Sequence, residues 1–188
     1  MLNRKSSTKL ETVKELIYWS YANLAMAHAA LEKELPKYNR LSFMIRSRIY
    51  KGLISGNMNI GSMFDDEKIK IKFSDICAYC GSNDNISIDH IIPRYKGGDN
   101  CADNLIRVCK HCNSSKGKKD MIEWFYSKNE FPPILILRRY LKLVYAYCIE
   151  NNLLDCKIDS IDKTLLPFNL DYIPTNFPQP NDIVLYKK

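Results

Sequence analysis

The fold of this chain is decided by residues 77–119, CAYCGSNDNISIDHIIPRYKGGDNCADNLIRVCKHCNSSKGKK. This stretch holds two Cys-x-x-Cys pairs, formed by Cys77 with Cys80 and by Cys109 with Cys112. Zn²⁺ prefers tetrahedral sulfur or nitrogen ligands, and two residues between cysteines let one turn present both sulfurs to one ion. The sequence therefore predicts a structural zinc site with these four cysteines as its ligands.

The segment between the two pairs is longer than in a usual zinc ribbon, so we expect it to carry a fold of its own. β-Branched residues over 86–92 predict a strand that carries Asp89 and His90 near its end. Residues 105–108 predict the return strand, and a short turn and then a helix are expected from Lys110 onward. The predicted order is strand, loop, strand and helix, with a zinc ion at the base.

The insert carries side chains suited to phosphodiester hydrolysis. That reaction needs an activated water, which a neutral imidazole such as that of His90 can provide. It also needs a counter-charge for the phosphorane and the leaving oxygen, which a divalent cation supplies. Asp89 and Asn113 offer hard oxygen ligands suited to Mg²⁺ or Mn²⁺. Adjacent side chains on a strand diverge, so Asp89 and His90 can act from different sides, and the Asn104 amide can bridge backbone groups across the loop.

The run CxxC…DHIIPRYKGG…NL…VCKHCNSSKG resembles the HNH endonucleases, which belong to the ββα-metal nucleases, over about a quarter of the chain. The resemblance implies that His90 is the general base and that Asp89 ligates the catalytic metal. Asn104 and Asn113 match the two later positions of the motif, and Asn113 is expected at the start of the helix, facing Asp89. The four cysteines are expected to hold a structural zinc. The implied fold class is α+β: a small ββα-metal core with a four-cysteine zinc site, flanked by N- and C-terminal α-helices.

The chain is expected to divide into three regions. These are 1–68, an N-terminal helical region; 69–130, the HNH nuclease core with zinc; and 131–188, a C-terminal helix and extended arm. Apolar periodicity predicts helices over 11–34, 42–53 and 134–151. The alternating residues 69–73 predict either a short strand or a lead-in to the zinc site. The last helix is expected to pack on the first, so that the two flanks form one helical subdomain.

The formal net charge of +7 favours a polyanionic partner. Five basic side chains are candidates for DNA phosphate contacts: Arg46 and Arg48 on the predicted second helix, and Lys116, Lys118 and Lys119 after the second cysteine pair. A solvated charged face explains the same pattern, and both interpretations stay open at this point.

The function that the sequence predicts is that of a metal-dependent DNA endonuclease with a restriction or phage-defence role. Two alternatives remain: a non-catalytic zinc-ribbon module that binds DNA, and a nuclease subunit of a larger defence complex. A homodimer is the other partnership left open, because double-strand cutting by a single-site enzyme often needs two copies. No apolar run is long enough to cross a membrane, and the cysteine usage suits a reducing cytosol, so a cytoplasmic protein is expected.

Overall fold

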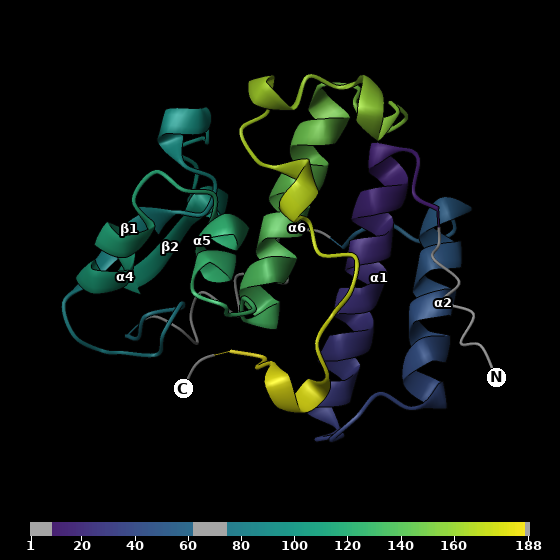
Figure 1. Cartoon of the computed structure of the whole chain (residues 1–188), viewed down its shortest axis with the longest axis horizontal. Helices are drawn as coiled ribbons and strands as arrows, with labels where there is room; N and C mark the ends of the chain where they lie inside the picture. The colour runs from purple at the N-terminus through teal and green to yellow at the C-terminus, as the bar shows by residue number, and fades with distance from the viewer. Residues whose placement is uncertain (1–8, 62–74, 187–188) are drawn as a thin grey trace.

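Three long helices and a small sheet make up the computed structural model of this chain, which describes residues 9–61 and 75–186 (Figure 1). Helix α1 (Val13–Glu32) lies between α2 (Arg40–Ile54) and α6 (Ile134–Glu150). The two-stranded sheet and two short helices lie on the other side of α6. This is the predicted α+β class, with a small core flanked by N- and C-terminal helices.

The first two helices begin at capping boxes. The Thr12 hydroxyl accepts from the Glu15 backbone N–H, and the Glu15 carboxylate accepts from the Thr12 N–H at 3.0 Å. Asn39 and Ser42 make the equivalent pair at the start of α2. Because each pair satisfies two backbone donors that have no partner within the helix, it fixes where the helix begins. The predicted helices over 11–34 and 42–53 are confirmed, with ends shifted by one or two residues.

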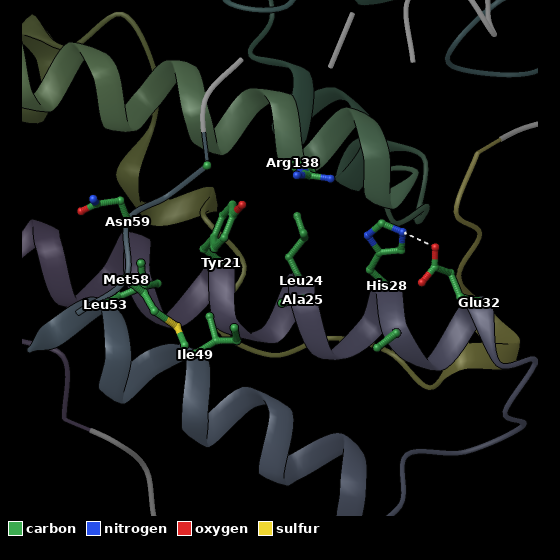
Figure 2. A pocket seen from close by; sticks show the side chains of 12 residues that line it. Tyr21, Leu24, Ala25, His28, Glu32, Ile49, Leu53, Met58, Asn59 and Arg138 are labelled. Carbon is green, nitrogen blue, oxygen red and sulfur yellow. Dashed lines mark ion pairs between the residues drawn. The ribbon is translucent and has the colours of Figure 1, made fainter. Parts of the chain in front are cut away.

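Helix α6 follows a proline pair and packs on α1, as the sequence predicts. Its first turn is almost entirely buried, so the helix runs through the centre of the molecule. A pocket of about 410 Å³ lies among α1, α2 and α6 and is lined by Tyr21, His28, Arg138 and other side chains (Figure 2). None of the site residues predicted from the sequence lines this pocket.

The sheet pairs β1 (Ile86–His90) with β2 (Leu105–Cys109) in antiparallel register, with Asp89 opposite Ile106. The first strand is shorter than the predicted range of 86–92. It ends at His90 because the Asn104 side chain bonds both the N–H and the C=O of Ile92, in place of a neighbouring strand. The loop between the strands therefore folds back on the end of β1.

Two helices follow the second cysteine pair, where the sequence predicts a turn and one helix. Helix α4 (Lys110–Lys116) begins directly after Cys109, whose sulfur accepts from the Cys112 N–H. It ends at Gly117, which has a φ of +54° that disfavours other residues. Asp120 then caps α5 (Met121–Ser127) by accepting from the Ile122 and Glu123 N–H groups. The prediction of a single helix was wrong because it passed over this glycine and this cap.

The C-terminal segment from Asp155 lies on the body as an arm of short 3₁₀ turns, in agreement with the sequence prediction (Figure 1). It buries five large apolar side chains: Leu166, Phe168, Leu170, Ile173 and Ile183. Its last residues return to the start of α6, where Ile134 and Leu135 donate to backbone carbonyls of the arm. The predicted strand over 69–73 lies outside the described residues. No helix in 9–61 or 75–186 is long and apolar enough to cross a membrane.

Candidate active site and metal centre

The four predicted zinc ligands come together at one end of the sheet. Cys77 and Cys80 lie in the turn before β1, and Cys109 and Cys112 lie where β2 meets α4. Their sulfur atoms all lie within 4.8 Å of one another, and the Cys80 and Cys109 sulfurs are 3.7 Å apart. A tetrahedral zinc with bonds of about 2.3 Å places its sulfurs about 3.8 Å apart. The cluster therefore has the ligand type, number and spacing that Zn²⁺ takes in a closed structural site.

Burial raises the pKa of the Cys77 and Cys112 thiols. Zinc binds cysteine as the thiolate, so uptake of the ion releases the protons that these buried thiols hold. Zinc binding by this cluster is accordingly expected to weaken as the pH falls.

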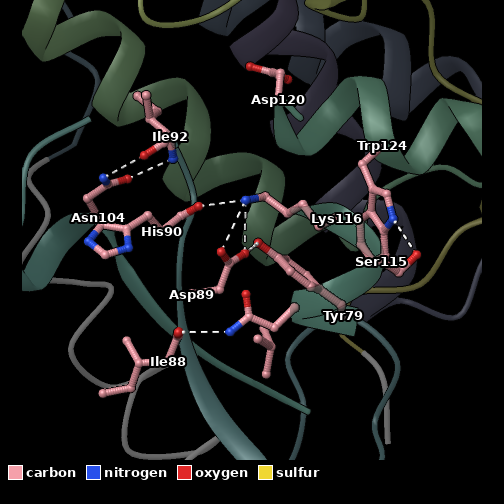
Figure 3. Close-up of polar contacts among 12 residues, drawn as sticks. Tyr79, Ile88, Asp89, His90, Ile92, Asn104, Ser115, Lys116, Asp120 and Trp124 are labelled. Atoms are coloured by element: carbon pink, nitrogen blue, oxygen red, sulfur yellow. Dashed lines mark hydrogen bonds and ion pairs between the residues drawn. The ribbon is translucent and has the colours of Figure 1, made fainter. Parts of the chain in front are cut away.

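Asp89 lies near the end of β1 with its side chain only 7% exposed. The Tyr79 hydroxyl donates to its Oδ2 atom at 2.9 Å, and the Lys116 ammonium lies 3.2 Å from Oδ1 and 3.0 Å from Oδ2. The same ammonium donates to the His90 carbonyl oxygen at 2.8 Å (Figure 3). A buried ion pair thus joins the end of β1 to the end of α4.

The structure corrects the DNA-binding role predicted for Lys116. Its side chain is 0% exposed, and three acceptors on β1 hold its ammonium, so it presents no charge to a phosphate at the surface. Lys118 and Lys119 are exposed, and the Lys118 ammonium lies 4.6 Å from the centre of the Tyr95 ring. These two lysines remain candidates for phosphate contacts.

The structure does not bring Arg46 and Arg48 to the sheet, because α1 and α6 separate α2 from it (Figure 1). The Arg46 guanidinium lies 4.7 Å from the centre of the Trp19 ring and donates to Asn23. Arg48 is exposed. A contact between either arginine and DNA remains a prediction.

His90 is the last residue of β1, and its ring points away from the Asp89 carboxylate (Figure 3). This divergence follows from the alternation of side chains along a strand. The ring is partly exposed, and its Nε2 atom lies 2.9 Å from the Asn100 side-chain oxygen. The imidazole is therefore accessible from solvent and already held by a residue of the loop.

Asn104 is 1% exposed and bridges the backbone across the loop, as the sequence predicts. Its side-chain oxygen accepts from the Ile92 N–H at 2.8 Å. Its side-chain nitrogen donates to the Ile92 carbonyl at 2.9 Å and to the Asp99 carbonyl at 2.8 Å. All of these bonds are internal, so Asn104 shapes the loop that carries Asn100.

Asn113 lies on α4, in the fourth position of that helix. Its side-chain nitrogen donates to the Ser87 hydroxyl and to the Ile88 carbonyl, each at 3.1 Å. The amide oxygen is the atom that this residue could offer to a cation beside Asp89. The two oxygen donors fit a hard divalent ion in chemistry. A cation that binds Asp89 must, however, compete with the Lys116 ammonium and the Tyr79 hydroxyl for the carboxylate lone pairs.

Sequence reasoning missed four contributors to the site: Tyr79, Asn100, Arg139 and the inward ammonium of Lys116. Arg139 is a charged residue in a strongly apolar helix, which is a signal for a buried polar partner. Its guanidinium donates to the Asp103 carbonyl at 2.6 Å and to the Ala102 carbonyl at 2.5 Å. The other residues carry no local signal, because their partners are distant in the chain.

Comparison with known proteins agrees with this geometry. Residues 77–121 match the family model of the HNH endonucleases. Residues 77–121 form an HNH endonuclease domain. A stretch of 52 residues is also 46% identical to the CRISPR-associated endonuclease Cas9 of Corynebacterium diphtheriae.

The resemblance predicted from the sequence is confirmed for residues 77–121. The match to Cas9 covers 26% of this chain and 5% of that protein, so the chain spans a small part of its relative's length. No solved structure matches the chain. Helices α1, α2 and α6 all lie outside the matched residues.

Proposed function

We propose that this protein is a metal-dependent endonuclease that hydrolyses DNA phosphodiester bonds, with His90 as the general base. The observation that carries the proposal is the position of His90 in the HNH domain. Its imidazole is accessible at the end of β1, and the adjacent Asp89 points into the opposite side of the strand. A base and a cation ligand are thereby held on either side of one strand.

In the proposed reaction, His90 takes a proton from a water molecule as the water oxygen bonds to phosphorus. The bond from phosphorus to the 3′-oxygen breaks, and that oxygen leaves with the electron pair. A Mg²⁺ or Mn²⁺ ion held by Asp89 and Asn113 would stabilise the charge on the phosphorane and the leaving oxygen. Asn113 keeps α4 against β1 through Ser87 and Ile88, which fixes its own position relative to Asp89.

Lys118 and Lys119 are proposed to contact DNA phosphates. Both are exposed just beyond α4, and the ring contact of Lys118 places its charge beside the loop that carries Asn100. Each phosphate contact of this kind releases counterions, so DNA binding should weaken as the salt concentration rises.

A specific observation favours a second candidate function, a zinc-ribbon module that binds DNA without cutting it. Both Asp89 oxygens are bound by side chains of this chain, one of them a buried ammonium. If Lys116 stays in place in the presence of a divalent ion, its ammonium competes with that ion for the Asp89 carboxylate. Cleavage assays separate the two functions directly.

The exposed apolar surface of α2 supports a role for this protein as a nuclease subunit of a larger restriction or phage-defence assembly. This helix exposes four large apolar side chains: Leu41, Phe43, Met44 and Ile54. A helix of this kind favours burial against another protein. A homodimer would bury the same surface, and the mass of the purified protein by light scattering separates a dimer from a monomer.

The test of the endonuclease is cleavage of supercoiled plasmid in Mg²⁺ and in Mn²⁺ by the parent protein and by His90→Ala. Loss of the base should lower the rate by roughly 10²- to 10⁴-fold. Zinc content and thermal stability should stay unchanged, because the partly exposed ring supports no packing in the core.

His111→Ala is the matched control, because His111 is an exposed histidine within the second cysteine pair. It should cut at the parent rate. A His90→Ala protein that cuts at the parent rate would remove His90 from the reaction. A parent protein that leaves plasmid intact in every divalent metal would favour the non-catalytic zinc module.

A further inference from the structure

We infer that Asn100 is a positioning residue that sets the tautomer and orientation of His90, and this inference rests on the proposed role of His90 as base. The His90 Nε2 atom lies 2.9 Å from the Asn100 Oδ1 atom. An amide oxygen only accepts hydrogen bonds, so Nε2 must carry the proton. The Nδ1 atom then keeps the lone pair that can accept a proton from water.

The loop that carries Asn100 is held closely against the end of β1. The Asn104 side chain binds the Asp99 carbonyl, which belongs to the peptide group directly before Asn100. Gly98 permits this close approach of the loop to the end of β1, because a Cβ atom at position 98 would lie 2.0 Å from the Ile92 carbonyl oxygen. The Gly98 N–H also donates to the Pro93 carbonyl at 3.1 Å. The backbone on the N-terminal side of Asn100 is thus fixed relative to the strand that ends in His90.

Helix α6 supports the same loop from outside the HNH match. Arg139 is 5% exposed, and its guanidinium holds the carbonyls of Ala102 and Asp103. Hydrogen bonds from a charged donor are stronger than neutral ones, and two donors of one planar group fix the direction of both carbonyls. These carbonyls directly precede Asn104. A continuous set of contacts therefore runs from Arg139 through Asn104 to Asn100 and His90.

The two orientations of the Asn100 amide have opposite chemical consequences. With Oδ1 toward His90, the Nε2–H tautomer is stabilised and Nδ1 is the base. With the amide nitrogen toward His90, Nε2 must accept the hydrogen bond, so Nδ1 carries the proton. Nδ1 is then unable to accept a proton from water. Aspartate at this position can only accept, so it reproduces the first orientation and excludes the second.

The experiment compares the zinc-loaded parent protein with Asn100→Ala, Asn100→Asp and the control Asn83→Ala. Asn83 is an exposed asparagine whose side chain makes no hydrogen bond within 9–61 and 75–186. Asn83→Ala therefore removes the same amide group as Asn100→Ala but breaks no contact with His90. Cleavage is measured at about pH 8.5, which is about two units above the unperturbed imidazole pKa of roughly 6.5.

Asn100→Ala should lower kcat by roughly 10- to 100-fold with little change in KM, as for other partners that orient a functional histidine. Asn100→Asp should restore most of the rate, and Asn83→Ala should match the parent. If Asn100→Asp is as slow as Asn100→Ala, the amide does not act as an acceptor and the inference is wrong. Equal zinc content and melting temperature in all variants exclude a general loss of fold.

The second readout is the tautomer of His90, followed by ¹⁵N NMR of the imidazole without DNA or divalent ion. The parent and Asn100→Asp should show a protonated Nε2, and Asn100→Ala should show a mixture of tautomers. A parent protein with its proton on Nδ1 would overturn the inference. If the parent cuts no DNA, the proposed function fails, and the NMR result still decides whether Asn100 sets the tautomer of His90.

Discussion

The HNH domain and the helical flank hold their buried side chains by different kinds of contact. In the HNH domain and the adjoining start of α5, every buried polar side chain is hydrogen-bonded: Asp89, Asn104, Lys116 and Asp120. In α1 the buried positions are mainly apolar. Two buried polar atoms lack a partner among the described residues, the Ser20 and Tyr38 hydroxyl oxygens, and both lie in the flank. The buried polar side chains of the domain are therefore all bonded, whereas the flank leaves two buried hydroxyl groups without a partner among the described residues.

These bonds explain how so small a sheet keeps the candidate site in place. Two five-residue strands bury little apolar surface, so their geometry depends on the sulfur cluster and on hydrogen bonds. The flank adds further fixed points through α6. The Tyr140 hydroxyl donates to Asp120 at 2.6 Å, and Arg139 binds the loop before Asn104. Helix α6 therefore lies beside the HNH domain and also stabilises it through these hydrogen bonds.

The largest expected effect tests the zinc cluster. Cys109→Ser removes one ligand and should release zinc, whose binding contributes about 10–16 kcal/mol to the folding of zinc-finger peptides. Hydrogen exchange should then show lost protection in β1, β2 and α4, while α1 keeps its protection. Cys101→Ser is the control, because Cys101 is exposed and lies outside the sulfur cluster. Equal loss of protection in α1 would show that the two regions fold as one unit.

The parts of the site that sequence reasoning predicts are those whose signal is local. The spacing of the cysteine pairs predicts the sulfur cluster, and β-branched residues beside Asp89 and His90 predict the strand. The amide of Asn104 bridges the loop as expected from its place at the end of that loop.

The parts that sequence reasoning misses depend on contacts between distant residues. Nothing in the run KGKK indicates that Lys116 turns inward while Lys118 stays exposed, because the partner of Lys116 is Asp89, 27 residues earlier. The link from Arg139 to the Asp103 carbonyl spans 36 residues, and its existence depends on how α6 packs. Such contacts follow from tertiary structure and not from local pattern.

An intermediate effect is expected from the buried ion pair. Lys116→Met leaves the Asp89 carboxylate buried with only the Tyr79 hydroxyl as a side-chain partner among residues 9–61 and 75–186. Breaking a buried pair in this way costs about 3–5 kcal/mol. Urea unfolding at neutral pH measures the change in the free energy of unfolding.

Lys118→Met is the matched control, and as a substitution of an exposed side chain it should change that free energy by about 0.5 kcal/mol or less. Mn²⁺ affinity, followed by electron paramagnetic resonance, should rise in Lys116→Met, because the competing ammonium is gone. A Lys116→Met protein as stable as the parent would mean that apolar packing alone holds this end of the domain.

The smallest expected effect lies in the flank and depends on pH. Burial lowers the pKa of His28, and Arg138 lowers it further, while the neighbouring Glu32 acts in the opposite direction. Because the folded-state pKa of His28 lies below the unfolded value of about 6.5, the neutral ring contributes stability that is fully present above about pH 6.5. It is lost as the pH falls through the folded-state pKa, because the unfolded chain binds the proton more readily. The free energy of unfolding should therefore fall less steeply with acid in His28→Gln than in the parent.

Urea unfolding curves of both proteins between about pH 7.5 and 5.5 measure this slope. Glu32→Gln is the matched variant, because removal of the opposing carboxylate should lower the pKa of His28 further and steepen the loss. Zinc release from the cysteine cluster also destabilises the protein in acid, but it contributes equally to all three proteins. If His28→Gln and the parent lose stability with the same slope, the acid sensitivity belongs to the zinc cluster, and the apolar flank carries none of it.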